Sequence, residues 1–143
     1  MTTISDPDLS SFDVGDEIPS FSIPLTVQRL VMETAANRDL APIHHNDAVA
    51  QAQGAPRMFA NTLFLAAMYE ATAREWAGLR AKIERITFRM LKFNCAGEVV
   101  DCKAKVRSRS NGADGTRVEL EMWTETGNGM TSSGTLVVHV PAA

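Results

Sequence analysis

The chain has 143 residues, of which 45% are hydrophobic and 22% are charged, and its formal net charge is −3. This length and composition predict a single globular domain over residues 1–143, and the weak negative charge excludes a general electrostatic attraction to nucleic acid or to an anionic membrane. No apolar run is long enough to cross a bilayer and the start of the chain does not read as a signal peptide, so we expect a cytoplasmic protein.

The N-terminal part of the chain predicts an arm, an edge strand and a helix. Residues 1–11 are polar and acidic, and we expect them to form a flexible arm. The stretch from Ile18 to Ile23 is flanked and interrupted by prolines, which cannot donate to a sheet, so it is predicted to be a strand at a sheet edge. Thr26 is expected to cap a helix with apolar residues at helical spacing, and this helix should end near Asn37.

Two further helices are predicted after residue 46. Asp47 is expected to cap a short helix that Gly54 stops. The segment from Phe59 to Gly78 is rich in alanine, leucine and methionine and is apolar on most sides. It therefore predicts a buried helix about 30 Å long.

The rest of the chain alternates between apolar and polar residues, which indicates strands. Four strands joined by short turns are predicted in residues 82–93, 98–110, 116–126 and 130–140. They imply an antiparallel meander with one face in water. A curved antiparallel sheet wrapped around the long helix, an α+β architecture, is the predicted fold. Cys95 and Cys102 match no metal or redox spacing and are expected to be reduced thiols.

Titratable side chains are concentrated in residues 37–47, which read NRDLAPIHHND. Asp39 and His44 are five residues apart, and Pro42 keeps the chain between them out of a helix, so a bent loop can bring the two side chains together. Histidine titrates near neutrality and an apolar groove opposes ionisation of a carboxyl group, which suits general acid–base catalysis. The alternative is structural: Asp39 caps a turn, and His44 is a buried histidine with its hydrogen bonds satisfied.

The same spacing argues against a metal site. His44 and His45 are adjacent and point apart in most backbone conformations, and no His-x3-His or carboxylate triad accompanies them, so no metal is expected. His45 is expected to face solvent or to set the loop. His139, near the end of an alternating strand, is expected to be structural.

The start of the long helix is a second candidate site. Asn61 and Thr62 lie near its N-terminus, where free backbone N–H groups and the helix dipole favour an anion such as a developing enolate oxygen. Asn61 can also be the N-cap of this helix, because a cap leaves other N–H groups free.

These motifs together resemble the MaoC-like dehydratases, a family that includes the (R)-specific enoyl-CoA hydratases and has the hotdog fold. The family loop runs roughly Gly-Asp-x-Asn-Pro-Ile-His before a short helix that ends at glycine. The matching residues here are Asp39, Pro42, Ile43, His44 and Gly54. The likeness extends from about Phe12 to Val140, and its order agrees with the predicted elements.

The resemblance implies hydration of a trans-2-enoyl-CoA thioester to a 3-hydroxyacyl-CoA, or the reverse dehydration. Asp39 and His44 would polarise one water molecule, and backbone N–H groups near Asn61 would hold the thioester oxygen. No cofactor is implied, because coenzyme A is part of the substrate. The implied assembly is a homodimer or a heteromer with a second MaoC-like chain.

Three departures from the family pattern bear on function. Arg38 replaces the usual glycine, Ala41 replaces the usual asparagine, and Ala60-Asn61 replaces the usual His-Gly at the helix start. The loss of that last glycine can narrow the approach of a thioester. The double histidine and the stretches AQG, FAN and EWAG are similar to the small MaoC subunit of actinobacterial steroid side-chain hydratases, which implies a bulky steroid-type acyl group.

Two other functions stay open on the sequence. The altered loop and helix start also fit a non-catalytic hotdog subunit that completes the thioester pocket of another chain. An acyl-CoA thioesterase would likewise need a carboxylate near a helix start, although the spacing of Asp39 and His44 fits a hydratase better.

Overall fold

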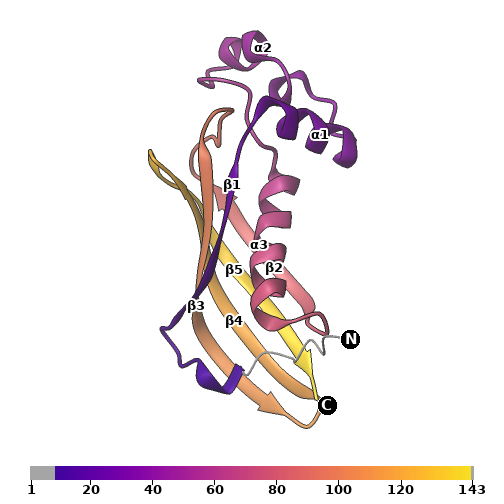
Figure 1. Cartoon of the computed structure of the whole chain (residues 1–143), viewed down its shortest axis with the longest axis vertical. Helices are drawn as coiled ribbons and strands as arrows, with labels where there is room; N and C mark the ends of the chain where they lie inside the picture. Colours follow the sequence, from indigo (N-terminus) through magenta and orange to yellow (C-terminus); the bar gives the residue numbers. More distant parts are fainter. Residues whose placement is uncertain (1–8, 143) are drawn as a thin grey trace, which may run out of the picture.

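The computed structural model describes residues 9–142, which form a five-stranded antiparallel sheet bent around one long helix (Figure 1). The strands are β1 (Glu17–Pro24), β2 (Lys82–Met90), β3 (Val99–Gly112), β4 (Gly115–Thr126) and β5 (Gly129–Pro141). Their order across the sheet is β1-β3-β4-β5-β2. The long helix, α3 (Thr62–Ala77), lies against one face of this sheet. The predicted α+β architecture is confirmed.

The shorter elements gather at one end of the molecule, beside the start of α3 (Figure 1). They are α1 (Val27–Asn37), the 3-10 turn η2 (Pro42–His44) and α2 (Asp47–Ala52). A further 3-10 turn, η1 (Leu9–Ser11), precedes β1. Residues 1–8 of the predicted arm lie outside the described residues, whereas Leu9 is 8% exposed and packs in the core. No helix within residues 9–142 is long and apolar enough to span a membrane.

Three of the four strands predicted for the meander are connected as expected, and one is not. Strands β3, β4 and β5 are joined by the two predicted hairpin turns. Strand β2, however, pairs with β5 and not with β3, so the simple four-strand meander is wrong. The reason is that residues 91–98 are held under the start of α3, where Ala60 N–H donates to Asn94 O and Ala96 N–H donates to Met58 O. The chain therefore passes from β2, at one edge of the sheet, to β3, which lies next to the opposite edge strand β1.

The core lies between α3 and the inner face of the sheet. Alternate residues of β3 point inward and are buried, namely Val100, Cys102, Ala104 and Val106. From α3, Leu65, Met68 and Tyr69 are buried against them. This packing explains why the helix is apolar on most sides, because it is covered by a sheet that bends around it. Both cysteines are buried and free of disulfides, as expected.

The carboxylate of Asp47 links α2 to the segment before α3. The prediction that Asp47 caps α2 is therefore wrong. Asn46 is the N-cap of α2, because its side chain accepts from Val49 N–H at 3.2 Å. Asp47 is the first helical residue, and its carboxylate accepts from Met58 N–H at 2.8 Å and from Arg57 at 3.0 Å. The hydrogen bond from Met58, followed by that from Arg57, lowers the pKa of Asp47 below its ordinary value of 3.8.

Asp47→Asn is expected to lower the free energy of unfolding at neutral pH. A carboxyl group with a depressed pKa in the folded state contributes stability above its unfolded pKa of 3.8 and loses it as the pH falls through the folded value. The difference between wild type and variant should therefore disappear under strongly acid conditions. Urea unfolding of both proteins across a pH series measures it, and a difference that is constant with pH would contradict the assignment.

Candidate active site

The loop that carries the predicted catalytic residues begins with a left-handed turn at the end of α1. Thr26 caps α1 as predicted, and the helix ends at Asn37. Arg38 follows with φ 56° and ψ 26°, and its N–H donates to the carbonyl of Ala35. This is the position that favours glycine, and a side chain there costs roughly 1–2 kcal/mol. This turn changes the direction of the chain after α1, so that Asp39 is directed towards the start of α3.

The loop brings Asp39 and His44 together. His44 is 7% exposed, and its Nε2 lies 3.4 Å from Oδ2 of Asp39, whose side chain is 33% exposed. The other ring nitrogen, Nδ1, lies 2.8 Å from the carbonyl oxygen of Phe59. The phenyl ring of Phe59 also packs edge-on against the imidazole, with ring centres 5.0 Å apart. The imidazole is therefore fixed from two sides.

The contact with Phe59 decides where the protons of this pair are. A carbonyl oxygen only accepts, so Nδ1 of His44 must carry a hydrogen. A neutral imidazole would then present a lone pair on Nε2 to a carboxylate oxygen of Asp39, which is also an acceptor. The arrangement is favourable when one proton is shared by the two groups, directly or through one water molecule. The Asp39–His44 pair is thus built to give up one proton and to accept another.

Asn61 connects this pair to the long helix. It is 3% exposed, and its Oδ1 accepts from Phe64 N–H at 2.9 Å, which makes it the N-cap of α3. Its Nδ2 donates to Oδ2 of Asp39 at 2.8 Å. The Asp39 carboxylate therefore lies at the positive end of α3, where the helix dipole favours a negative charge.

The structure thus brings three of the four predicted site residues into contact, namely Asp39, His44 and Asn61. The side chain of Asn61 is engaged on both sides, so only backbone groups at this helix start are left for a ligand. The side chains of Thr62 and Leu63 are exposed. Their N–H groups belong to the first turn, which offers no acceptor within the helix.

The other two histidines do not join the pair. His45 is exposed, and its Nε2 lies 3.3 Å from Leu40 O, so it supports the loop from outside. His139 is on β5, where it bonds to Asp114 O at 3.1 Å. Among residues 9–142, no three histidine, cysteine, aspartate or glutamate side chains are grouped so that they could hold a metal ion.

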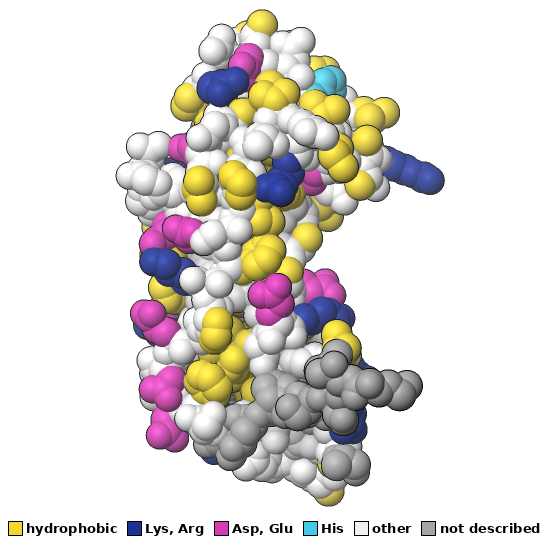
Figure 2. Space-filling view, in the orientation of Figure 1, with side chains coloured by type: hydrophobic (Ala, Val, Ile, Leu, Met, Phe, Trp, Pro, Cys, Tyr) yellow, Lys and Arg dark blue, Asp and Glu magenta, His cyan; other side chains and the backbone are white. Residues whose placement is uncertain are grey.

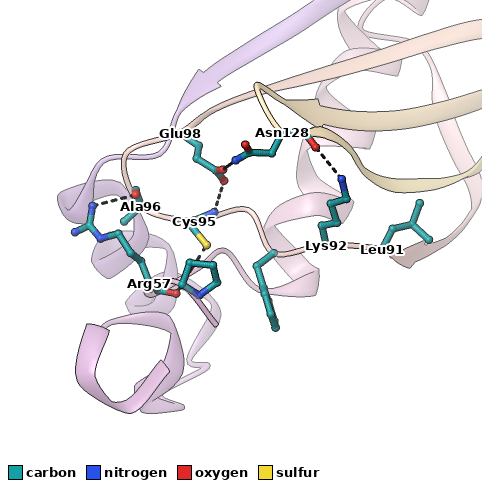
Figure 3. Close-up of a pocket in the computed structure, with 9 residues that line it drawn as sticks. Arg57, Leu91, Lys92, Cys95, Ala96, Glu98 and Asn128 are labelled. Atoms are coloured by element: carbon teal, nitrogen blue, oxygen red, sulfur yellow. Dashed lines mark hydrogen bonds between the residues drawn. The ribbon is translucent and has the colours of Figure 1, made fainter. Parts of the chain in front are cut away.

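A cavity of about 520 Å³ lies between the segment before α3, residues 91–98 and the turn between β4 and β5 (Figure 3). Phe59 contacts Phe93, with ring centres 4.5 Å apart, and Phe93 lines this cavity. Arg57 and Lys92 add two cations, and Glu98 adds one carboxylate, to a wall that is otherwise mostly apolar. Lys92 Nζ donates to Asn128 O at 2.7 Å. Neither Asp39 nor His44 lines the cavity, and the ring of Phe59 contacts both His44 and the cavity residue Phe93.

Two features of this site were not predicted from the sequence. The carbonyl group of Phe59 gives no sequence signal, because every residue carries one. The cavity is lined by residues from the connector before α3, from residues 91–98 and from the turn between β4 and β5. These segments are far apart in the sequence. Their meeting depends on the pairing of β2 with β5, which the sequence did not predict.

Comparison with known proteins connects the chain to solved structures only. No family model matches the sequence, and no curated protein matches it. A chain of the ChsH1-ChsH2 complex from Mycobacterium tuberculosis is similar with a TM-score of 0.83 and 23% identity, over 90% of this chain and 98% of that one. The (R)-hydratase PhaJ1 from Pseudomonas aeruginosa is similar with a TM-score of 0.82 and 16% identity, over 96% and 88%.

A MaoC-like dehydratase from Rhodospirillum rubrum is also similar, with a TM-score of 0.75 and 16% identity, over 94% of this chain and 97% of that one. At these identities the likeness is one of fold. The chain has the hotdog fold found in MaoC-like dehydratases and (R)-hydratases, as predicted.

Proposed function

We propose that the chain is a MaoC-like hydro-lyase that adds water across the double bond of a trans-2-enoyl-CoA thioester, or removes it in the reverse direction. The observation that carries this proposal is the contact between Asp39 and His44, with Nε2 and Oδ2 3.4 Å apart, at the capped start of α3. The fold shared with proteins described as an (R)-hydratase and a MaoC-like dehydratase supports it.

In this proposal the Asp39–His44 pair exchanges two protons in one turnover. One member accepts a proton from water as the hydroxyl group bonds to Cβ of the substrate. The proton that the pair already shared moves to Cα, so the pair ends with as many protons as it began with. Backbone N–H groups of Thr62 and Leu63 stabilise the thioester oxygen while it is enolate-like.

We assign the coenzyme A part of the substrate to the cavity beyond Phe59. Its apolar wall suits a pantetheine arm, and Lys92, whose Nζ donates to the carbonyl oxygen of Asn128, supplies positive charge for a phosphate group, whereas Arg57 is paired with Asp47. No separate cofactor is proposed, because coenzyme A enters as part of the substrate. For the acyl group we propose a bulky steroid-type chain, because the double histidine and the stretches AQG, FAN and EWAG are similar to the small MaoC subunit of steroid side-chain hydratases.

We further propose that a second hotdog chain, a copy or a different MaoC-like chain, packs beside this site. Large apolar side chains are exposed around it, including Val31, Met32, Leu40 and Leu63. Figure 2 shows apolar side chains gathered over the end of the molecule that carries α1 and α2. Exposed apolar patches of this kind mark interaction surfaces. The edge of β2 that faces away from β5 is a second surface where a strand could pair.

The direct test is hydration of a short-chain and of a steroid enoyl-CoA by the purified chain, alone and with any partner that co-purifies. Loss of the enoyl thioester absorbance and a gain of one water in product mass support the proposal. Release of free thiol, detected with a thiol reagent, would indicate a thioesterase. A chain that is inactive alone, in a complex that stays active with Asp39→Asn, would indicate a non-catalytic subunit.

Asn61→Ala is expected to weaken both the helix and the reaction. It removes the cap of α3, at a cost of about 1 kcal/mol, and it frees the Asp39 carboxylate to rotate. Misplacement of a catalytic group by about 1 Å lowers the rate on the order of a hundredfold. Urea unfolding and initial rates of hydration measure the two effects.

Asn61→Ser is the matched variant, because it keeps a capping oxygen but loses the amide N–H donor to Asp39. It should unfold closer to wild type than Asn61→Ala does, while its hydration rate stays low. Full activity in both variants would show that Asn61 does not hold Asp39 for the reaction.

A further inference from the structure

Strand β2 leaves one edge of the sheet open. The strand order places β1 and β2 at the two edges, and within residues 9–142 no strand pairs with the side of β2 that faces away from β5 (Figure 1). The β1 edge is protected by a bulge and by Pro19 and Pro24, which carry no N–H. Strand β2 contains no proline, and its register is regular from Arg85 to Met90. Its free N–H and C=O groups can therefore pair with another strand.

The inner face of β2 also favours a neighbouring strand. Ile86, Phe88 and Met90 pack against the core but remain partly exposed. The inward residues Leu120 and Met122 of the interior strand β4 are 0% exposed. A strand added beside β2 would cover the apolar side chains at this edge and extend the core.

The outer face of β2 carries two arginines without carboxylate partners. Arg85 and Arg89 alternate with the inward residues, their side chains are exposed, and neither forms an ion pair with a described residue. Glu84, the acidic residue of this strand, is paired with Arg117 of β4. Basic side chains of β3 are instead paired with glutamates of β4, namely in Lys103–Glu125, Lys105–Glu121 and Arg107–Glu119.

These arginines disfavour a second copy of the chain as the strand that pairs here. In an antiparallel pair opposite residues share a face of the sheet, so two copies related by a two-fold axis pair about one central residue. A centre at Thr87 puts Arg85 opposite Arg89 of the copy, and a centre at either arginine puts that arginine opposite itself. A centre at Ile86 or Phe88 puts an arginine diagonal to arginines of the copy, at roughly 7–8 Å. Like charges are therefore neighbours in every such register, which destabilises the strand pair.

We propose that the free edge of β2 pairs with a hotdog chain that is not a copy of this one, through an edge strand that carries carboxylate side chains at alternate positions of its outer face. Carboxylates opposite Arg85 and Arg89 replace the repulsion of self-pairing by attraction. The inference deepens the proposed assembly with a second hotdog chain and rests on that part of the proposed function, but it uses neither the Asp39–His44 pair nor a substrate.

A charge-reversed copy of the chain serves as the acidic partner in the test. The double variant Arg85→Glu/Arg89→Glu should keep the fold, which circular dichroism checks, because both side chains are exposed and unpaired. Fluorescence anisotropy of the labelled double variant titrated with wild type should give a dissociation constant about tenfold or more below that of either protein with itself. This advantage should shrink in about 1 M salt. Wild type that self-associates as tightly as the mixture, or a mixture that does not associate, would overturn the proposal.

Arg85→Glu alone tests the register of the pairing. In a self-pair centred at Thr87 it places a carboxylate opposite Arg89 of the copy, so this variant should self-associate more tightly than wild type although it is more acidic. Arg107→Glu makes the same change of charge on the interior strand β3 and should self-associate no more tightly than wild type. Equal self-association of the two variants would show that the edge does not control association and would overturn the proposal.

Association and hydration are measured separately, so the two proposals can fail independently. If the mixture associates as expected but neither the chain nor the mixture hydrates an enoyl-CoA, the proposed reaction fails and the assignment of the partner stands. If the purified chain hydrates an enoyl-CoA but the mixture forms no heterodimer, the assignment of the partner fails and the reaction stands.

Discussion

Asp39→Asn is expected to lower kcat/KM for enoyl-CoA hydration by about 10²–10⁴-fold, the usual contribution of a general acid–base group. The amide that replaces the carboxyl group keeps its size and can still contact Asn61, so the loop should keep its shape. What is lost is the ability of the pair to share and pass on a proton across the 3.4 Å between Nε2 and Oδ2. His44→Gln should have an effect of the same order, measured by the decrease in enoyl thioester absorbance.

His45→Gln is the matched control for this experiment. It removes the neighbouring imidazole, which is exposed and contacts only the outer side of the loop at Leu40 O. Its rate should stay within a few-fold of wild type, and circular dichroism should show that all three variants fold alike. Wild-type turnover in both Asp39→Asn and His44→Gln would rule out the pair as the catalytic centre.

Gly134→Ala is expected to destabilise the protein by about 3 kcal/mol or more, at the upper end for overpacking substitutions. Gly134 is on β5 opposite Phe88 of β2. An added Cβ would collide with the carbonyl oxygen of Thr87 and would lie 2.6 Å from Cα of Phe88. These are backbone or backbone-near atoms, so strand β2 would have to move away from β5. Urea unfolding followed by circular dichroism measures the loss.

Gly127→Ala provides the comparison for that substitution. Gly127 lies in the turn between β4 and β5, and a Cβ there would meet no atom within 4 Å. Its free energy of unfolding should differ from wild type by no more than about 0.5 kcal/mol. Equal stability of the Gly134 and Gly127 variants would mean that β2 is not packed against β5 in this register.

The sequence predicted the fold where the local pattern alone decides the structure. Alternation along β3 and the turn residues 111–115 identify a hairpin, because inward side chains and turn conformation are local properties. The neighbour of β2 was mispredicted because strand order depends on where residues 91–98 are held by the start of α3. Asp47 was mispredicted because its partner, Met58, is eleven residues away, whereas Asn46 is the cap that the backbone needs.

The sequence indicated which residues would meet at the candidate site, but few of the contacts between them. The spacing of Asp39 and His44 around a proline was enough to bring them together, and Asn61 was placed correctly at the helix start. Its hydrogen bond to Asp39 joins two segments that only the tertiary structure brings into contact.

The bond between Nδ1 of His44 and the carbonyl oxygen of Phe59 gives this centre mutational robustness. In many enzymes a side chain orients the histidine, and one codon change removes it. Here every residue type at position 59 supplies the same acceptor, provided that the backbone keeps its path. As far as this bond is concerned, selection is then free to exchange the side chain of residue 59.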